Sequence, residues 1–201
     1  MTENDAQQEL AFIKKVMEDS RRIIAYDGKD FTVWGILVAV GMILMYLKIV
    51  FQFQIDSMIF WGILIGTGWL FSIKRRFTHY RKRRVKTFAG AVIGSVWLSC
   101  GIVMTLIGFV LGPVGAIKGW AIMPLIALVL GIGYFITSVI IPNRWIRYSA
   151  FGWWIGGILI AAYPAPYILL VFAGMMICFQ IIPGIVLQRQ YRKQFDKVSH
   201  D

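Results

Sequence analysis

Long apolar segments alternate with short polar ones along this chain. Each apolar segment is long enough to form a membrane-spanning helix. The six segments lie at about residues 31–50, 57–73, 88–111, 119–141, 146–163 and 165–187. A helix rises about 1.5 Å per residue, so about twenty residues cross the ~30 Å hydrocarbon layer of a bilayer. The segments are continuously apolar, which favours helices over the alternating strands of a β-barrel. We therefore predict an all-α membrane protein with six transmembrane helices.

The composition favours a membrane protein over a soluble one. Of the 201 residues, 58% are hydrophobic and only 15% are charged. Soluble domains are about 45–50% apolar and about 25% charged, and a chain of this length cannot bury such an excess in one core. The net charge is +11. The cations lie between apolar segments, as in membrane proteins, so we expect the lipid bilayer and not nucleic acid as the partner.

The positions of the Lys and Arg residues predict the orientation. All of the 21 except Lys48 and Lys118 lie in the N-terminal segment, between the second and third spans, at or just before the start of the fifth span (Arg144 and Arg147), or in the C-terminal tail, residues 188–201. Cytoplasmic segments of membrane proteins carry such an excess of cations. We therefore expect both termini in the cytoplasm and the transmembrane bundle, residues 31–187, to consist of three antiparallel hairpins.

The N-terminal segment, residues 1–30, is predicted to form a cytoplasmic amphipathic helix over about residues 4–27, ended by Gly28. At 100° per residue its apolar side chains share one face, opposite a face of charged residues. The residues expected to contact an interface or partner are Leu10, Phe12, Ile13, Val16, Met17 and Ile24. Two interpretations stand: the helix lies in the lipid interface, or it docks on another copy or on a membrane-protein partner.

A dense basic segment, predicted as a cytoplasmic loop over residues 74–87, separates the second and third spans. Its cations are Lys74, Arg75, Arg76, Arg81, Lys82, Arg83, Arg84 and Lys86. Each cation near an anionic leaflet contributes about 1 kcal/mol of attraction. The segment either anchors the topology only, or it also contacts anionic phospholipid headgroups or an acidic partner.

Reactive side chains are scarce in the predicted spans. No Asp, Glu, Lys, Arg or His lies deep inside any of them. Ion-coupled transport, metal or haem binding and intramembrane proteolysis require such groups. His79 and His200 lie in basic segments, and Cys100 and Cys178 are expected to be packing residues and not a disulfide. We therefore expect no enzyme, no catalytic or metal-ligating residue and no cofactor.

Local patterns predict how the helices pack. Trp-Gly-Ile-Leu occurs at residues 34–37 and again at 61–64. We attribute this recurrence to the small set of residue types used in membrane spans more readily than to a duplication. Four pairs of glycines spaced four residues apart predict close helix contacts inside the bundle: Gly62/Gly66, Gly90/Gly94, Gly108/Gly112 and Gly152/Gly156. Pro183 removes a helical hydrogen bond to Phe179, so the sixth span is expected to kink or end there.

Two functions fit these features. The first is a non-enzymatic accessory, regulatory or scaffolding component that acts through its cytoplasmic face. The alternative is a channel-like facilitator or transporter subunit for a small neutral solute, which requires the polar side chains of the spans to face one common axis. The candidate lining residues are Thr67, Ser95, Ser99, Thr105, Thr137, Ser138 and Gln180.

The segment from Glu9 to Arg21, ELAFIKKVMEDSR, resembles the opening of a group of small bacterial multi-helix membrane proteins of unknown function. These begin with a pattern such as E-L-x-F-I-[RK]-x-x-M-E-x-S and continue into a first span that contains glycine, here Gly35 and Gly41. The resemblance covers about the first 45 residues. It implies a multi-pass protein of the bacterial inner membrane, and it implies no activity or ligand.

Replacing Ile13, Met17 and Ile24 together with Ser tests whether the N-terminal face docks. We expect a smaller oligomer or loss of co-purified protein in detergent, measured by light scattering coupled to size exclusion, because the apolar face is removed. Lys14, Lys15 and Glu18 replaced with Ser, on the opposite face, serve as the control. Unchanged size and composition in the first variant would eliminate docking.

Overall fold

A computed structural model describes residues 28–82, 88–141 and 143–189, and every regular element in these ranges is a helix. The helices are α2 Lys29–Phe51, α3 Ser57–Lys82, α4 Phe88–Leu106, α5 Ile122–Ile140, α6 Arg144–Ala162 and α7 Ile168–Met176. The π-helical turns η2 Ile107–Leu111 and η4 Ile177–Ile181 extend α4 and α7, and a 3₁₀ turn, η3 Gly119–Ala121, precedes α5. The predicted all-α class is confirmed for these residues.

Five helical segments are long and apolar enough to cross a membrane, and they indicate a multi-pass membrane protein. They are Lys29–Phe51, Ser57–Thr78, Ala89–Leu111, Gly119–Ile140 and Ile168–Arg189. Large hydrophobic side chains such as Ile63, Leu70 and Ile158 are exposed along the bundle, which soluble proteins rarely allow over a whole surface. The fifth predicted span, residues 146–163, corresponds to α6, which is not one of these five. In α6, arginine, tryptophan and glycine take the place of many aliphatic residues.

The helix ends lie close to the predicted limits, with one clear difference. The sequence predicts a span at residues 57–73 followed by a loop from residue 74, but α3 continues to Lys82. Lys and Arg are good helix formers, and neither Gly nor Pro occurs between residues 74 and 82. The predicted loop is therefore wrong for residues 74–82, because the charges mark where the apolar surface ends and do not end the helix.

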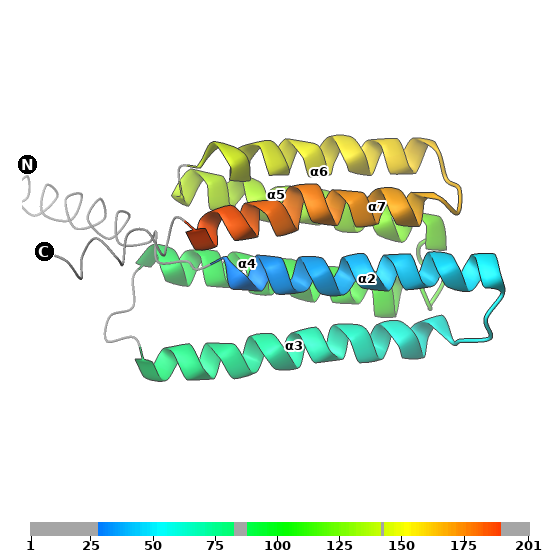
Figure 1. Ribbon diagram of the computed structural model, residues 1–201, viewed down its shortest axis with the longest axis horizontal. Coiled ribbons are helices and arrows are strands. Elements are labelled where there is room, and N and C mark those ends of the chain that lie inside the picture. The colour runs from blue at the N-terminus through cyan, green and yellow to red at the C-terminus, as the bar shows by residue number, and fades with distance from the viewer. Residues whose placement is uncertain (1–27, 83–87, 142, 190–201) are drawn as a thin grey trace, which may run out of the picture.

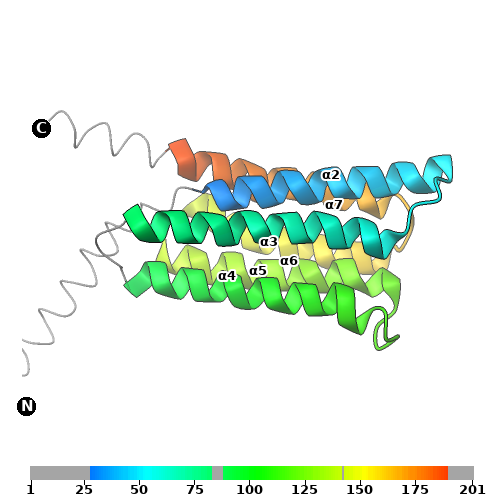
Figure 2. The same ribbon diagram turned by 90° about the horizontal axis from the view of Figure 1, so that it is seen from below.

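The helices lie side by side along one common direction, and their connections alternate between the two ends of the bundle (Figures 1 and 2). The most extensive contacts join α5 to α6 and α2 to the α7 segment. By contrast, α3 is peripheral: 6% of its most apolar stretch is buried, against 44% for α5. Packing as three sequential hairpins is not confirmed, because α2 and α7 come from opposite ends of the described chain.

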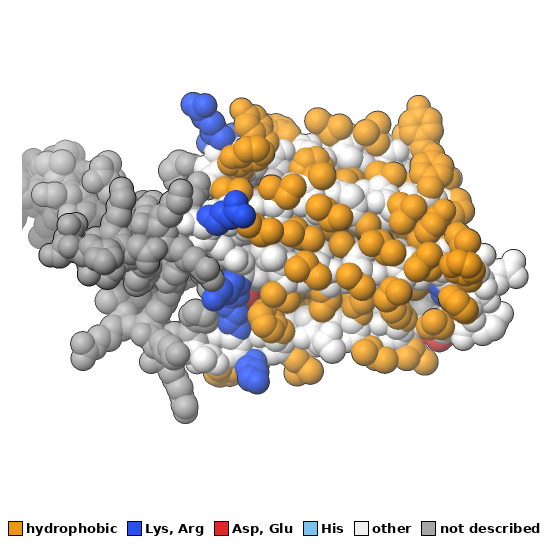
Figure 3. Space-filling model, in the orientation of Figure 1, with side chains coloured by type: hydrophobic (Ala, Val, Ile, Leu, Met, Phe, Trp, Pro, Cys, Tyr) orange, Lys and Arg blue, Asp and Glu red, His pale blue; other side chains and the backbone are white. Residues whose placement is uncertain are grey.

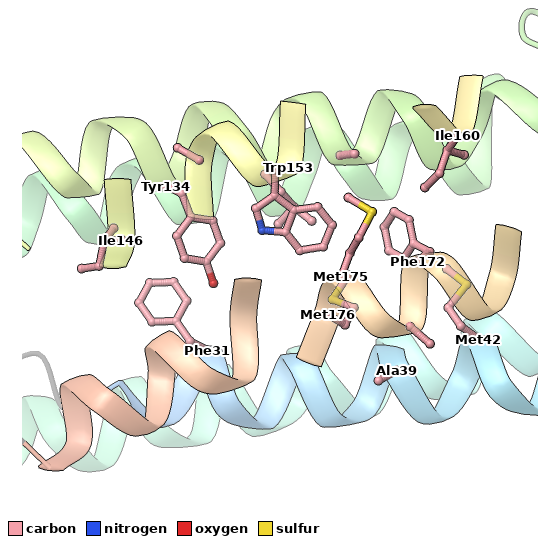
Figure 4. Close-up of a cluster of buried hydrophobic side chains, with 14 of the residues drawn as sticks. Phe31, Ala39, Met42, Tyr134, Ile146, Trp153, Ile160, Phe172, Met175 and Met176 are labelled. Carbon is pink, nitrogen blue, oxygen red and sulfur yellow. The ribbon is translucent and has the colours of Figure 1, made fainter. Parts of the chain in front are cut away.

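An aromatic cluster fills the space between these helices (Figure 4). Phe31 of α2 stacks on Tyr134 of α5, with ring centroids 5.3 Å apart. The ring centroids of Trp153 of α6 and Phe172 of α7 are 5.5 Å apart. Tyr134, Trp153 and Phe172 are fully buried. Four helices therefore share one interior, and rigid rings define their spacing.

Trp97 of α4 connects to α5 through a glycine and a hydroxyl. A Cβ atom at Gly133 would lie 3.3 Å from the Trp97 ring, so only glycine leaves this room without a shift. The indole N–H of Trp97 donates to the hydroxyl oxygen of Thr137 over 3.0 Å. That hydroxyl donates in turn to the carbonyl oxygen of Gly133 over 2.7 Å. Both polar groups are thus satisfied inside the protein, without water.

The same arrangement, which we call the Trp–Gly–hydroxyl contact, occurs at two more helix pairs. It consists of Trp34, Gly68 and Ser72 between α2 and α3, and of Trp69, Gly101 and Thr105 between α3 and α4. The two indole N–H groups donate over 2.8 Å and 3.3 Å respectively. In each case the hydroxyl comes four residues, about one helical turn, after the glycine.

The Trp-Gly-Ile-Leu recurrence corresponds to reciprocal packing of α2 and α3. A Cβ atom at Gly68 would lie 2.6 Å from the Trp34 ring, and one at Gly41 would lie 3.0 Å from the Trp61 ring. Each helix therefore places its tryptophan on the glycine of the other. The recurring residues therefore pack the two helices together. Chance repetition among the few residue types of membrane spans does not require such a role.

The glycine pairs differ in outcome. Gly152 receives the Phe179 ring, at 2.6 Å from a Cβ placed there, and Gly156 receives the Met175 side chain, so this pair packs inside the bundle as predicted. The prediction is wrong for Gly62/Gly66, because α3 is peripheral: a Cβ at Gly66 would meet nothing within 4 Å, and one at Gly62 only a ring atom at 3.9 Å.

The two glycine pairs of the third span also fail to give a close contact at both positions. A Cβ at Gly94 or at Gly108 would meet nothing within 4 Å.

Pro183 does not end the last helix, contrary to one of the two expectations. The helical run continues to Arg189. The π-helical turn η4 comes directly before the proline, and the backbone N–H of Ile182 donates to the carbonyl of Ile177. The wider turn accommodates a ring that cannot donate and that would crowd the carbonyl of Phe179. Pro183 itself is fully buried.

We expect Trp97→Phe to lower the free energy of unfolding by about 0.6 kcal/mol, because it removes one hydrogen bond between helices in an apolar environment. The measurement is reversible unfolding in mixed micelles, in a cycle with Thr137→Val. The double variant should lose less than the sum of the single losses. Trp120→Phe, on the exposed η3 turn, is the control. Additive losses would show that the bond contributes nothing.

Candidate functional site

Basic side chains gather at one end of the bundle, next to the edge of the apolar surface (Figure 3). We call it the basic end, and its described cations are Lys29, Lys74, Arg75, Arg76, Arg144, Arg147 and Arg189. In the described part of the chain, the opposite end carries Lys48 and Lys118. The uneven distribution of cations, on which the predicted orientation rests, is therefore present in the folded chain.

Arg75 at the basic end makes an ion pair that the sequence does not predict. Its guanidinium nitrogen lies 3.0 Å from the carboxylate oxygen of Asp30, and only 13% of the Arg75 side chain is exposed. Asp30 lies in the first turn of α2, where the helix dipole also favours a negative charge. The sequence groups Arg75 with cations that contact lipid, but the fold directs it to a partner within the protein. No spacing links the two residues, because they lie on different helices.

Lys74 and Arg76 are exposed on α3, on either side of Arg75. Phe77 follows them and is 72% exposed. One turn of α3 thus presents two cations and an aromatic ring to the surroundings, a combination that suits the boundary between hydrocarbon and headgroups. The other predicted lipid contacts lie at the end of α3 or beyond it. Arg81 and Lys82 are the last residues of α3, and Arg83, Arg84 and Lys86 lie outside the described residues.

A close crossing of α2 and the last helix also lies at the basic end. Gly28 has a φ of +60°, the left-handed conformation expected for a residue that ends a helix, and it is buried. A side chain at Gly28 would meet the carbonyl oxygen of Gly184. The side-chain amide of Gln188 donates to the hydroxyl oxygen of Thr32 over 3.2 Å, and that hydroxyl donates to the Gly28 carbonyl over 3.3 Å. Residues near the two ends of the described chain are thus held together.

The predicted amphipathic face lies outside the described residues. This applies to Leu10, Phe12, Ile13, Val16, Met17 and Ile24. What the structure adds is the place where that segment joins the bundle. The chain enters at Gly28 and leaves at Arg189, both at the basic end (Figure 1).

The polar residues proposed to line a solute path do not converge on one axis. Thr67, Ser95 and Ser99 are exposed on the outer surface of the bundle. Thr105 and Thr137 donate to the carbonyl groups four residues earlier and accept from tryptophans, so their hydrogen-bonding groups are occupied. The hydroxyl of Ser138 is likewise bonded to the Phe135 carbonyl. This set of residues therefore gives no support to a continuous polar path.

A small apolar cavity of about 190 Å³ lies at the opposite end, between the end of α2 and the start of α3. Leu44, Leu47, Phe53 and Phe60 line most of it. Lys48 also lines it, and its ammonium group donates to the Ser57 hydroxyl over 2.7 Å. Because the lining is otherwise hydrocarbon, the cavity offers no set of polar groups that would orient a ligand.

No family model matches the chain, and no curated protein or solved structure is significantly similar to it. The resemblance of residues 9–21 to small bacterial membrane proteins is therefore untested, and that segment also lies outside the described residues. The features of the molecule that bear on function are the geometry of the basic end and that of the interior.

We expect Arg75→Gln to destabilise the protein by about 1 kcal/mol, because it removes the ion pair between Arg75 and the partly buried Asp30 carboxylate. Arg76→Gln, one residue away and exposed, should change the stability by much less. Thermal unfolding in detergent at low and high salt measures both. The exchange Asp30→Arg with Arg75→Asp should recover part of the loss, and equal effects of the Arg75 and Arg76 variants would contradict the assignment.

Proposed function

We propose that this protein is a non-enzymatic integral protein of the bacterial inner membrane and serves as an accessory, regulatory or scaffolding component. It spans the membrane six times, keeps both termini in the cytoplasm, and acts through its cytoplasmic face. The observation that carries this proposal is the gathering of exposed cations at one end of an otherwise apolar bundle.

The position of α6 supports a sixth crossing. It has 19 residues, about 28 Å of helix, close to the thickness of the hydrocarbon layer. Its contacts with α5 are the most extensive in the bundle. If α5 crosses the membrane, its close neighbour α6 crosses with it. The polar and aromatic residues at the start of α6, such as Arg144 and Trp145, then lie at the headgroup level.

The charges of the basic end support the proposed orientation. Segments rich in Lys and Arg stay on the cytoplasmic side, where the leaflet is also rich in anionic lipid. Lys74 and Arg76 are exposed at the level where the apolar surface ends, so their side chains are available to phosphate groups. Arg75 contributes less to lipid contact, because Asp30 already neutralises it.

A docking role for the cytoplasmic face is supported by where the chain ends emerge. The N-terminal segment joins the bundle at Gly28, and Gly28 and Gly184 are in close contact. An amphipathic helix that ends there and the basic tail that follows Arg189 would form one cytoplasmic surface. Such a surface would take a second copy of this chain or a membrane-protein partner, and the resemblance to small bacterial membrane proteins agrees with this location.

Lipid selectivity tests the proposal. In bilayers that contain spin-labelled lipids, we expect the protein to prefer phosphatidylglycerol over phosphatidylcholine. Lys74→Gln and Arg76→Gln should each lower the relative association constant by up to about fivefold, since one cation near the leaflet contributes about 1 kcal/mol. Lys118→Gln, at the opposite end, is the matched control. Equal selectivity in the Lys74, Arg76 and Lys118 variants would refute anionic-lipid binding at the basic end.

A further inference from the structure

The indole nitrogen of Trp153 and the side-chain carbonyl oxygen of Gln180 are buried inside the bundle and have no hydrogen-bond partner among the described residues. Trp153 is 0% exposed and Gln180 is 4% exposed. One atom is a hydrogen-bond donor and the other is an acceptor.

Both residues belong to the same interior layer. Trp153 is on α6, and its ring centroid lies 6.2 Å from that of Phe179, the residue before Gln180. Gln180 faces α2, because its Cγ atom lies 3.2 Å from where a Cβ of Gly35 would be. In Figure 4 the indole nitrogen of Trp153 lies on the side of the ring that faces Tyr134.

Other tryptophans in this bundle find acceptors. Trp34, Trp69 and Trp97 donate to hydroxyl groups, and Trp154 donates to the carbonyl oxygen of Leu128 over 3.2 Å. An indole N–H that is buried away from both water and protein acceptors costs free energy, and in lipid no solvent offsets it. Trp153 therefore differs from these four, because its buried donor has no acceptor among the described residues.

The backbone also departs from the α-helix at this point. Gln180 lies within the π-helical turn η4, and Pro183 follows it. Single π-helical turns inside helices often occur at functional sites. The rest of the layer is neutral: its labelled side chains in Figure 4 are aromatic rings and the thioethers of Met175 and Met176. Neutral walls disfavour an ion as the occupant.

We propose that Trp153 and Gln180 form a binding site for one small neutral molecule with a hydroxyl-like oxygen, either water or a small alcohol. The oxygen of the ligand accepts from the Trp153 indole N–H, and its hydrogen is donated to the Gln180 carbonyl oxygen. The site lies among α2, α5, α6 and the last helix. It would satisfy both groups and link α6 to the π-helical turn. It does not depend on the proposed role of the basic end.

Nuclear magnetic resonance of the full chain, labelled with ¹⁵N at the tryptophan indoles, tests the proposal in detergent. We expect a cross-peak between the Trp153 indole proton and the water resonance. Trp154 is the internal control, because it donates to a carbonyl oxygen that has no exchangeable proton. The variant Trp153→Phe assigns the resonance. If that variant does not fold, replacing the other tryptophans one at a time assigns it by elimination.

A relay through the hydroxyl of the neighbouring Tyr134 has to be excluded. The variant Tyr134→Phe removes that hydroxyl and should keep the cross-peak. In Gln180→Met, which removes the acceptor at similar volume, the intensity should fall at least severalfold. Loss of the cross-peak in Tyr134→Phe would overturn the assignment of the site to Trp153 and Gln180.

Methanol distinguishes the two occupants. A saturable shift of the Trp153 resonance alone, with loss of the water cross-peak, would show that an alcohol hydroxyl replaces water. An unchanged water cross-peak would show a site for water only, and both outcomes support a binding site. The absence of a water cross-peak at Trp153 would overturn the proposal. If the Trp153 resonance then also shifts in Gln180→Met, the two side chains are bonded directly to each other.

Discussion

The structure depends on satisfying polar groups where no water reaches them. Helices satisfy their own backbones, but each indole N–H still needs an acceptor. The Trp–Gly–hydroxyl contact supplies one: glycine lets the ring approach, and a hydroxyl one turn later accepts its hydrogen. Because Thr137 also donates to its own helix, the contact leaves no group unpaired. Repeated from α2 to α5, it holds even the peripheral α3, which otherwise has few buried side chains.

The basic end shows how charge is divided between internal and external roles. Three consecutive cations on α3 have different surroundings, because successive residues on a helix point about 100° apart. Arg75 faces Asp30, whereas Lys74 and Arg76 remain exposed. The ion pair joins α3 to α2, and the bond between Gln188 and Thr32 joins α2 to the last helix. The exposed cations therefore stand on a connected set of helices, which suits a surface that binds lipid or a partner.

In the interior, the buried indole N–H of Trp153 lacks the acceptor that the Trp–Gly–hydroxyl contacts provide elsewhere. Around Trp153 the neighbours are rings and thioethers, and the indole has no hydroxyl one turn after a glycine to receive it. Gln180 lies in the nearby π-helical turn η4, where the backbone departs from regular α-helical geometry. A bound small molecule with one donor and one acceptor would restore the balance seen at the other tryptophans. Conversely, the exposed positions of Ser95 and Ser99 give no support to a continuous path for solutes.

The sequence by itself determined the helices and their approximate ends, because hydrophobic length is a local property that the bilayer thickness fixes. It also placed the cations at one end, and Gly28 at a left-handed position. It could not reveal where α3 ends, since Lys and Arg are compatible with both helix and loop. Only the tertiary structure decided that Arg75 meets Asp30, that Trp97 meets Thr137, and that Trp153 and Gln180 share one layer. These partners are far apart in the chain, and which faces of the helices meet depends on the packing of all the helices together.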